Sequence, residues 1–328
     1  MAFPEHRLRR LRRSAGLRRL VRETRLHVDQ LVLPLLVVSG SNVSAEVAAL
    51  PGVCKLSADR AAALAVQAHD AGIGALLLCG LGERPDDHGS EAWNDGSPVP
   101  RAARAIRKQR PELVLLSEVA LSAFASSGRA GPVDRGGDGN SAVNNDAALE
   151  LIGQVALCHA RAGVDIVVPT EMIDGNVGYL REALDEKGFE AVAIGAAAGR
   201  LASAFDAVAA DTGLPAVQAA ASELIDPANA GEALRSLALA IEEGADLALV
   251  RPTLAALDLI AAARRELELP LVACQGWAEY AMIAAAAERG WVDGPAAQLE
   301  TLLAAHRAGA DLMVTPWALQ AAARLRSV

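Results

Sequence analysis

One short stretch of the chain indicates the fold: Gly244-Ala245-Asp246-Leu247-Ala248-Leu249-Val250-Arg251-Pro252. Gly244 follows a helical pattern and stands where a helix C-cap is expected, because glycine readily adopts the left-handed backbone of that position. The apolar run after it does not alternate with polar residues, which is typical of a strand buried on both faces. The run ends at Arg251. The stretch therefore predicts a helix, then a buried parallel strand with a charge at its C-terminal end.

The same pattern recurs along the chain. Eight apolar runs are found, at Leu31–Val38, Ala75–Gly80, Leu113–Val119, Ile166–Thr170, Ala191–Ala197, Leu247–Pro252, Leu271–Gln275 and Leu312–Thr315. Helical patterns lie between them, at Ala58–Ala71, Asp146–Ala162, Gly231–Gly244, Leu254–Leu267 and Ala296–Gly309. Eight strand–helix units over about 300 residues predict an α/β fold, a closed (β/α)8 TIM barrel. An open doubly wound sheet is the competing fold, but no Gly-x-Gly-x-x-Gly turn follows the first run, which weakens that alternative.

Three segments fall outside this pattern. Residues 1–30 form a basic stretch whose leucines recur at helical intervals only until Gly16 interrupts them, so we expect an arm that packs on another surface. The predicted domains are an N-terminal oligomerisation arm, 1–30, and a TIM-barrel domain, 31–328. Two long connections, 123–145 and 206–229, are expected at the C-terminal face of the barrel, where such loops carry the site or its lid.

Composition limits the classes of function. The 328 residues carry a net charge of -9, which argues against nucleic acid as a main partner. The sequence contains no apolar run long enough to cross a membrane, and the basic N-terminus has no apolar segment with a cleavage site. The four cysteines are far apart without metal-site spacing, which is typical of reduced thiols in a cytoplasmic protein.

Several stretches identify a family by their order and spacing. They include Leu31-Val32-Leu33-Pro34-Leu35, Gly89-Ser90-Glu91-Ala92-Trp93-Asn94, Ala202-Ser203-Ala204-Phe205, Asp226-Pro227-Ala228-Asn229 and Glu279-Tyr280-Ala281-Met282-Ile283. In these the chain resembles the porphobilinogen synthases, or 5-aminolevulinate dehydratases, along essentially its whole length. The resemblance implies a barrel whose arm wraps a neighbouring subunit in a homo-oligomer, a dimer or octamer. It also implies a lyase of heme and tetrapyrrole biosynthesis that condenses two 5-aminolevulinate molecules to a pyrrole.

The chain departs from the family at the reacting positions. The family uses two lysine amines to form Schiff bases with the keto groups of its substrates. The matching positions here are Arg200 and Arg251. A guanidinium stays protonated near neutral pH and cannot serve as the amine of an imine. The family's usual activity is therefore not expected from this sequence.

The family's metal and lid positions also differ. Many members hold a catalytic zinc through three cysteines, and the matching positions are Ala120, Ser122 and Ala130. None of these side chains is a thiolate, so we predict no catalytic zinc and no other cofactor. A glutamate that binds allosteric magnesium in some members is matched by Ser236, and two lid arginines are matched by Ala210 and Ala220.

The remaining candidates for a pocket are Glu118, Glu171, Arg200, Arg251, Gln275, Trp277 and Trp317. One interpretation is a sealed, structural pocket in which the two arginines pair with Glu118 and Glu171 while the two indole rings fill the vacated space. The other is an anion site, because two guanidinium groups suit a carboxylate or phosphate.

Three functions follow from these observations. The main prediction is a catalytically inactive homologue with a structural, regulatory or ligand-binding role, forming a homo-oligomer or a hetero-assembly with an active synthase. The first alternative is a repurposed barrel enzyme for a carboxylate or phosphate ligand, with Glu118 or Glu171 as acid or base. The second alternative is an authentic porphobilinogen synthase that acts by an atypical route.

Overall fold

The structure is a computed structural model that describes residues 5–135, 141–206 and 223–326. Eight parallel strands form a closed barrel: β1 (Leu31–Val37), β4 (Ala75–Gly80), β5 (Val114–Val119), β8 (Ile166–Pro169), β9 (Ala193–Arg200), β10 (Leu247–Arg251), β11 (Leu271–Cys274) and β12 (Leu312–Val314). Each strand pairs with its neighbours in this order, and β12 closes the barrel on β1 through Leu31 and Met313. The predicted TIM barrel is therefore confirmed.

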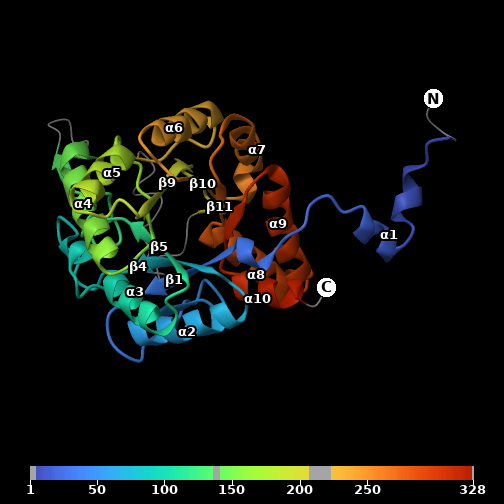
Figure 1. Cartoon of the computed structure of the whole chain (residues 1–328), viewed down its shortest axis with the longest axis horizontal. Helices are drawn as coiled ribbons and strands as arrows, with labels where there is room; N and C mark the ends of the chain where they lie inside the picture. Colours follow the sequence, from blue (N-terminus) through green and yellow to red (C-terminus); the bar gives the residue numbers. More distant parts are fainter. Residues whose placement is uncertain (1–4, 136–140, 207–222, 327–328) are drawn as a thin grey trace.

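Helices surround the strands, as Figure 1 shows. They are α2 (Ala58–Asp70), α3 (Pro98–Gln109), α4 (Asn145–Arg161), α5 (Asn176–Glu186), α6 (Ala230–Glu242), α7 (Leu257–Glu266), α8 (Trp277–Glu288), α9 (Gly294–Ala308) and α10 (Ala318–Leu325). One apolar cluster fills the layer between strands and helices, and a second, which includes Leu77, Leu249 and Trp277, fills the inside of the barrel. The barrel is thus a packed core whose strand ends carry the site.

Smaller elements decorate the barrel. Strands β2 (Ser44–Glu46) and β3 (Cys54–Leu56) form a hairpin that pairs with β1, and β6 (Val133–Arg135) pairs with β7 (Ser141–Val143). Short 3-10 helices are η2 (Val28–Gln30), η3 (Ser90–Trp93) and η6 (Leu254–Ala256). In the described parts of the chain no helix is both long and apolar enough to cross a membrane.

Two features of the sequence set the element boundaries. Gly244 and Gly309, both predicted helix C-caps, have φ of 104° and 125°, the left-handed backbone that suits glycine. The fifth barrel strand, β9, ends at Arg200, three residues beyond the predicted apolar run, because Arg200 still pairs in register with Arg251 of β10.

Helices α3, α5, α8 and α10 were not among the predicted helical patterns.

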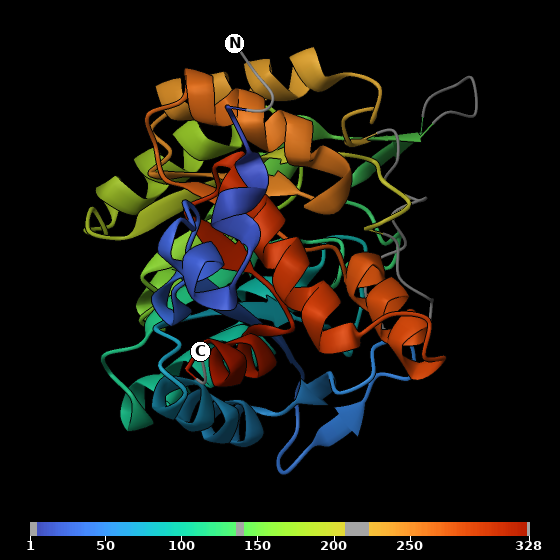
Figure 2. The ribbon, with the colours of Figure 1, turned by 90° about the vertical axis from the view of Figure 1, so that its right-hand side faces the viewer.

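The first two short helices of the N-terminal arm extend away from the barrel in Figure 1, and Figure 2 looks at the molecule from the side of these helices. It contains η1 (Leu8–Arg12) and α1 (Ala15–Leu20), and neither helix buries a residue. Leu8 and Leu20 are 82% and 75% exposed. Because exposed leucines on short helices do not stabilise them, the arm requires a surface to pack on.

Candidate active site

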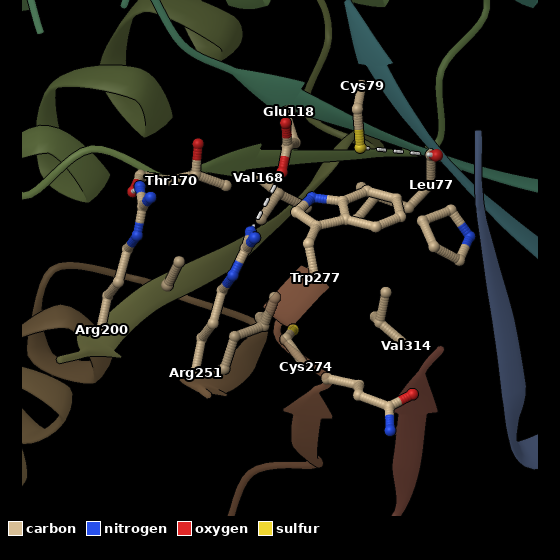
Figure 3. A pocket seen from close by; sticks show the side chains of 14 residues that line it. Leu77, Cys79, Glu118, Val168, Thr170, Arg200, Arg251, Cys274, Trp277 and Val314 are labelled. Atoms are coloured by element: carbon tan, nitrogen blue, oxygen red, sulfur yellow. Dashed lines mark hydrogen bonds and ion pairs between the residues drawn. The ribbon is translucent and has the colours of Figure 1, made fainter. Parts of the chain in front are cut away.

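Strands β9 and β10 place two arginines side by side at the mouth of the barrel. Arg200 and Arg251 are register partners at the C-terminal ends of these strands. A Cβ on Gly199 would lie 3.0 Å from the carbonyl oxygen of Leu249, so glycine at this position lets the two strands approach closely. Figure 3 shows both guanidinium groups reaching into the same pocket. Two adjacent positive charges with little access to water require a negative partner.

Asp206 is the carboxylate that contacts both arginines. Its side chain is fully buried, and Oδ1 lies 2.5 Å from Nε of Arg251 while Oδ2 lies 3.5 Å from Nε of Arg200. The first contact is a hydrogen bond, whereas Oδ2 and the Nε of Arg200 have no hydrogen-bond partner among the described residues. One carboxylate thus bridges both arginines and satisfies them incompletely.

Glu118 is the second carboxylate beside Arg251. Its Oε1 lies 3.7 Å from Nη1 of Arg251, and the two side chains point toward each other across the pocket in Figure 3. Burial lowers the pKa of Arg251, but the carboxylates of Asp206 and Glu118 outweigh burial and raise the pKa above its usual value. Arg251 is a permanent cation in this site. The sequence-based pairing of Arg251 with Glu118 agrees with this geometry.

Glu171 does not form the expected ion pair with an arginine and accepts backbone hydrogen bonds instead. Its two oxygens accept hydrogen bonds from the backbone N–H groups of Leu121 and Ser122 at 2.7–3.1 Å. Burial raises the pKa of Glu171, and these hydrogen bonds oppose the shift. Arg200 instead donates from Nη1 to the carbonyl oxygen of Thr170 at 2.7 Å. Glu171 therefore anchors the connection after β5, and Asp206 takes the place expected for it beside Arg200.

The pocket between these groups is small, about 30 Å³, which is room for one or two water molecules. Of the candidate residues, Gln275 and Trp277 line it, together with Cys79 and Cys274. Trp317 does not line it. Its ring stacks on Tyr280 at a centroid distance of 4.0 Å within the barrel core. A ligand larger than water therefore enters only when one of the lining side chains moves.

The two thiols of the pocket, those of Cys79 and Cys274, are protonated and unreactive. Burial raises the pKa of Cys274 to about 12 and that of Cys79 well above its usual value. A thiol acts as a nucleophile or metal ligand through its thiolate, which is scarce at such values. The pocket thus offers two cations, the carboxylate of Glu118 and a primary amide for polar chemistry, with the carboxylate of Asp206 beside it.

Glu279 fixes the backbone around both arginines. Its carboxylate accepts hydrogen bonds from the N–H groups of Thr253 at 3.1 Å, Leu254 at 2.5 Å and Gly276 at 2.6 Å. Its own N–H donates to the carbonyl oxygen of Phe205, the residue before Asp206. Glu279 is therefore a common anchor: its carboxylate holds the connections after β10 and β11, and its backbone N–H holds the connection after β9.

The family's metal positions do not fit a metal in this chain. Ala120, Ser122 and Ala130 offer no thiolate or carboxylate, and the backbone N–H of Ser122 donates to Glu171. Ser236 lies on α6 at a separate hollow of about 560 Å³, between α6 and the connection that precedes α5. Within the described ranges no cluster of three histidine, cysteine or acidic side chains has the arrangement of a metal site. Ala210 and Ala220 lie outside the described residues.

Sequence reasoning missed two central side chains. Asp206 follows a stretch that matches the family, but no periodicity distinguishes it from other loop acids. Glu279 lies in a stretch used only to recognise the family, and an acid among apolar residues at a helix start was the available signal for a buried carboxylate. Both positions depend on contacts between connections that are far apart in the sequence.

Known proteins resemble this chain over its full length. The family model described as Delta-aminolevulinic acid dehydratase matches residues 5–324. Delta-aminolevulinic acid dehydratases of Synechococcus elongatus and Bradyrhizobium diazoefficiens are 39% and 40% identical, over 98% and 97% of this chain and 98% and 90% of theirs. The Toxoplasma gondii delta-aminolevulinic acid dehydratase (porphobilinogen synthase), in complex with its reaction product porphobilinogen, has a TM-score of 0.89 and 33% identity. That match covers 97% of this chain and 91% of the other.

These similarities contradict the main prediction from the sequence, an inactive homologue. That prediction rested on the residues of one site, whereas the likeness to named dehydratases extends over the whole chain and includes a structure with bound product. They favour the second alternative, a dehydratase that acts by an atypical route.

Proposed function

Because the chain belongs to the delta-aminolevulinic acid dehydratase family, we propose that it condenses two molecules of 5-aminolevulinate to porphobilinogen. The observation that carries this proposal is the full-length match to a relative with porphobilinogen bound. The reaction forms one carbon–carbon and one carbon–nitrogen bond, and the two keto oxygens leave as water. The ring nitrogen comes from the amine of a substrate, so that bond requires no amine from the protein.

The two arginines take an electrostatic role in this route. A guanidinium cannot form an imine, but it donates charge-assisted hydrogen bonds to a carboxylate or to the oxyanion that develops when a ketone is attacked. Arg200 and Arg251 are fixed at the strand ends and shielded from water, which strengthens such interactions. They hold the acid group of a substrate and stabilise negative charge on the reacting oxygen.

Glu118 is the proton carrier of this proposal. It lines the pocket, and its contact to Arg251 is longer than that of Asp206, 3.7 Å against 2.5 Å. Glu171 is already engaged by two backbone N–H groups. A carboxylate within reach of the reacting atoms removes and returns the protons that leave with water. No step passes through a metal, since the residues at the zinc positions do not fit one.

Purified protein tests the route directly. With 5-aminolevulinate and a metal chelator present, we expect porphobilinogen to form, and borohydride added during turnover to leave no covalent adduct on the protein. Glu118→Gln, purified in the same way, is the matched control against a contaminating host dehydratase, and it should lose turnover. A folded protein that yields no porphobilinogen contradicts the proposal, and an adduct on Lys55, Lys108 or Lys187 contradicts the route.

The arm supports assembly with further copies of this chain in the cytoplasm. Residues 1–30 contain nine arginines and three acidic residues, which gives this segment a charge of +6. Because the whole chain has a net charge of -9, the remaining residues carry -15. A basic arm with exposed leucines suits the acidic body of another copy. We expect native mass spectrometry to find a dimer or octamer that dissociates when residues 1–30 are deleted. A stable oligomer without the arm contradicts this role.

A further inference from the structure

Asp206 stands between the arginines as a substrate carboxylate would. It comes from the connection after β9, not from a strand, and its side chain is buried between guanidinium groups on two neighbouring strands. Its Oδ1 receives a 2.5 Å hydrogen bond from Arg251, which is the geometry of a carboxylate bound to arginine. The two cations thus form a carboxylate site that a residue of the chain itself fills.

This internal ligand is held incompletely. Oδ2 of Asp206 and Nε of Arg200 lie 3.5 Å apart, both buried, and neither has a hydrogen-bond partner within the described ranges. Buried polar atoms without a partner are unfavourable, so a carboxylate that reached both arginines with better geometry would replace Asp206 at a gain. Glu118 lies 3.7 Å from Arg251, so its contact is too weak to replace that of Asp206.

Space gives a second, independent argument. The cavity beside the two arginines has about 30 Å³, which is too small for an external carboxylate, so an acid group that binds both arginines must take space that a side chain now fills. The backbone that leads into the aspartate is anchored, because the N–H of Asp206 donates to the carbonyl oxygen of Ser203 and the N–H of Glu279 donates to that of Phe205. The space between the two guanidinium groups is the space that the side chain of Asp206 fills, and that side chain can leave it while the backbone before it stays anchored.

We propose that Asp206 occupies the carboxylate-binding position of Arg200 and Arg251 in the ligand-free protein, and that the acid group of a ligand replaces it there. The inference rests on the proposed function in one respect: the proposed function identifies the ligand as a keto acid. Asp206 sets the affinity of the site, because a ligand that must displace it binds only to the fraction of molecules in which the site is open.

Asp206→Ala tests the inference with formate and levulinate, the second being a keto acid without the amine needed for turnover. We expect the variant to melt below the wild type in chloride, and formate to raise the melting temperature of the variant much more than that of the wild type. Levulinate should bind the variant about tenfold more tightly by calorimetry, which corresponds to an open fraction of about one tenth in the wild type. Asp165→Ala is the matched control, because Arg107 beside it keeps three carbonyl acceptors.

The outcomes separate the two proposals. Equal stabilisation of both variants by formate, or unchanged or weaker binding of levulinate, refutes the inference. If Asp206→Ala does not fold, Asp206→Asn keeps the shape without the charge and must show the same gain in levulinate affinity. Porphobilinogen formation is measured separately, on the wild-type protein. If Asp206→Ala binds levulinate more tightly but the wild type forms no porphobilinogen, only the proposed function is refuted. If the wild type forms porphobilinogen but the variant does not bind levulinate more tightly, only the inference is refuted.

Discussion

The two ends of the barrel use the same residue types in opposite ways. At the N-terminal end, Asp165 and Asp311 each accept the N–H of a strand residue, Leu115 or Leu271, and each pairs with an arginine. These arginines, Arg107 and Arg264, also donate to backbone carbonyl oxygens. At the mouth, Arg200, Arg251 and Asp206 are more deeply buried, and two of their polar atoms have no hydrogen bond among the described residues.

The difference separates stability from function. Half-exposed ion pairs add little by themselves, but a carboxylate that also accepts a strand N–H fixes the start of that strand. A buried cluster with unsatisfied atoms is a poor stabiliser and a good binding site, because a ligand can complete its hydrogen bonds. The chain thus anchors its strands at one end and leaves an incomplete charge cluster at the other, as expected for the two faces of this fold.

The largest effect is expected at the mouth, from Glu279→Ala. The change leaves the N–H groups of Thr253, Leu254 and Gly276 buried without an acceptor, each at about 1–3 kcal/mol. We expect the free energy of unfolding to fall by about 3 kcal/mol or more in urea denaturation. Glu279→Gln keeps one acceptor oxygen and should lose clearly less. A loss below about 1 kcal/mol in the alanine variant would mean that Glu279 does not hold the mouth together.

The next effect is expected between the two ends of the barrel, where helix α4 packs on strand β5. There Nδ1 of His159 on α4 lies 2.9 Å from the hydroxyl oxygen of Ser117 on β5. Burial lowers the pKa of His159 from 6.5 to about 3. The unfolded chain takes up a proton below its own pKa while the folded chain does not, so stability is present above pH 6.5 and is lost as pH falls. We expect this histidine to remove about 2–3 kcal/mol between pH 7 and pH 4.5.

His159→Asn isolates that contribution. The variant is less stable than the wild type at pH 7, since it loses packing and the contact to Ser117. Its stability should fall less steeply on acidification, so that the two unfolding free energies approach each other by about 2–3 kcal/mol at pH 4.5. Parallel pH profiles from urea denaturation would show that His159 takes up its proton in the folded barrel as well.

Much of the fold could be predicted from the sequence, because buried parallel strands are continuous apolar runs and all eight were recognised. Helix α8 was missed, since its residues are apolar on every face and show no helical period. At the site, the structure brings Arg200, Arg251, Glu118, Gln275 and Trp277 to one pocket, because all five lie at or after strand ends. Their bridging partner, Asp206, was not identified, because a connection without a repeating pattern does not show where its side chains point.

The smallest effects are expected at the N-terminal end, and they separate the ion pair from the strand anchor. The carboxylate of Asp311 accepts from the backbone N–H of Leu271 and pairs with Arg264. Among the described residues, the carboxylate of Asp246 accepts only from the backbone N–H of Ile194. We expect Asp246→Ala to lower the free energy of unfolding by about 1 kcal/mol through the lost hydrogen bond. Asp311→Ala should lower it by up to about 1 kcal/mol more, since its ion pair is partly exposed.

Salt distinguishes the two contributions. In concentrated sodium chloride the extra loss in Asp311→Ala should shrink, because screening weakens a partly exposed ion pair, while the loss in Asp246→Ala should stay. Neither variant should change the affinity for levulinate, since both lie at the opposite end of the barrel from the arginine cluster. A salt-independent difference, or a changed affinity, would show that the two ends of the barrel are coupled and that anchoring and binding are not separate tasks of its charged residues.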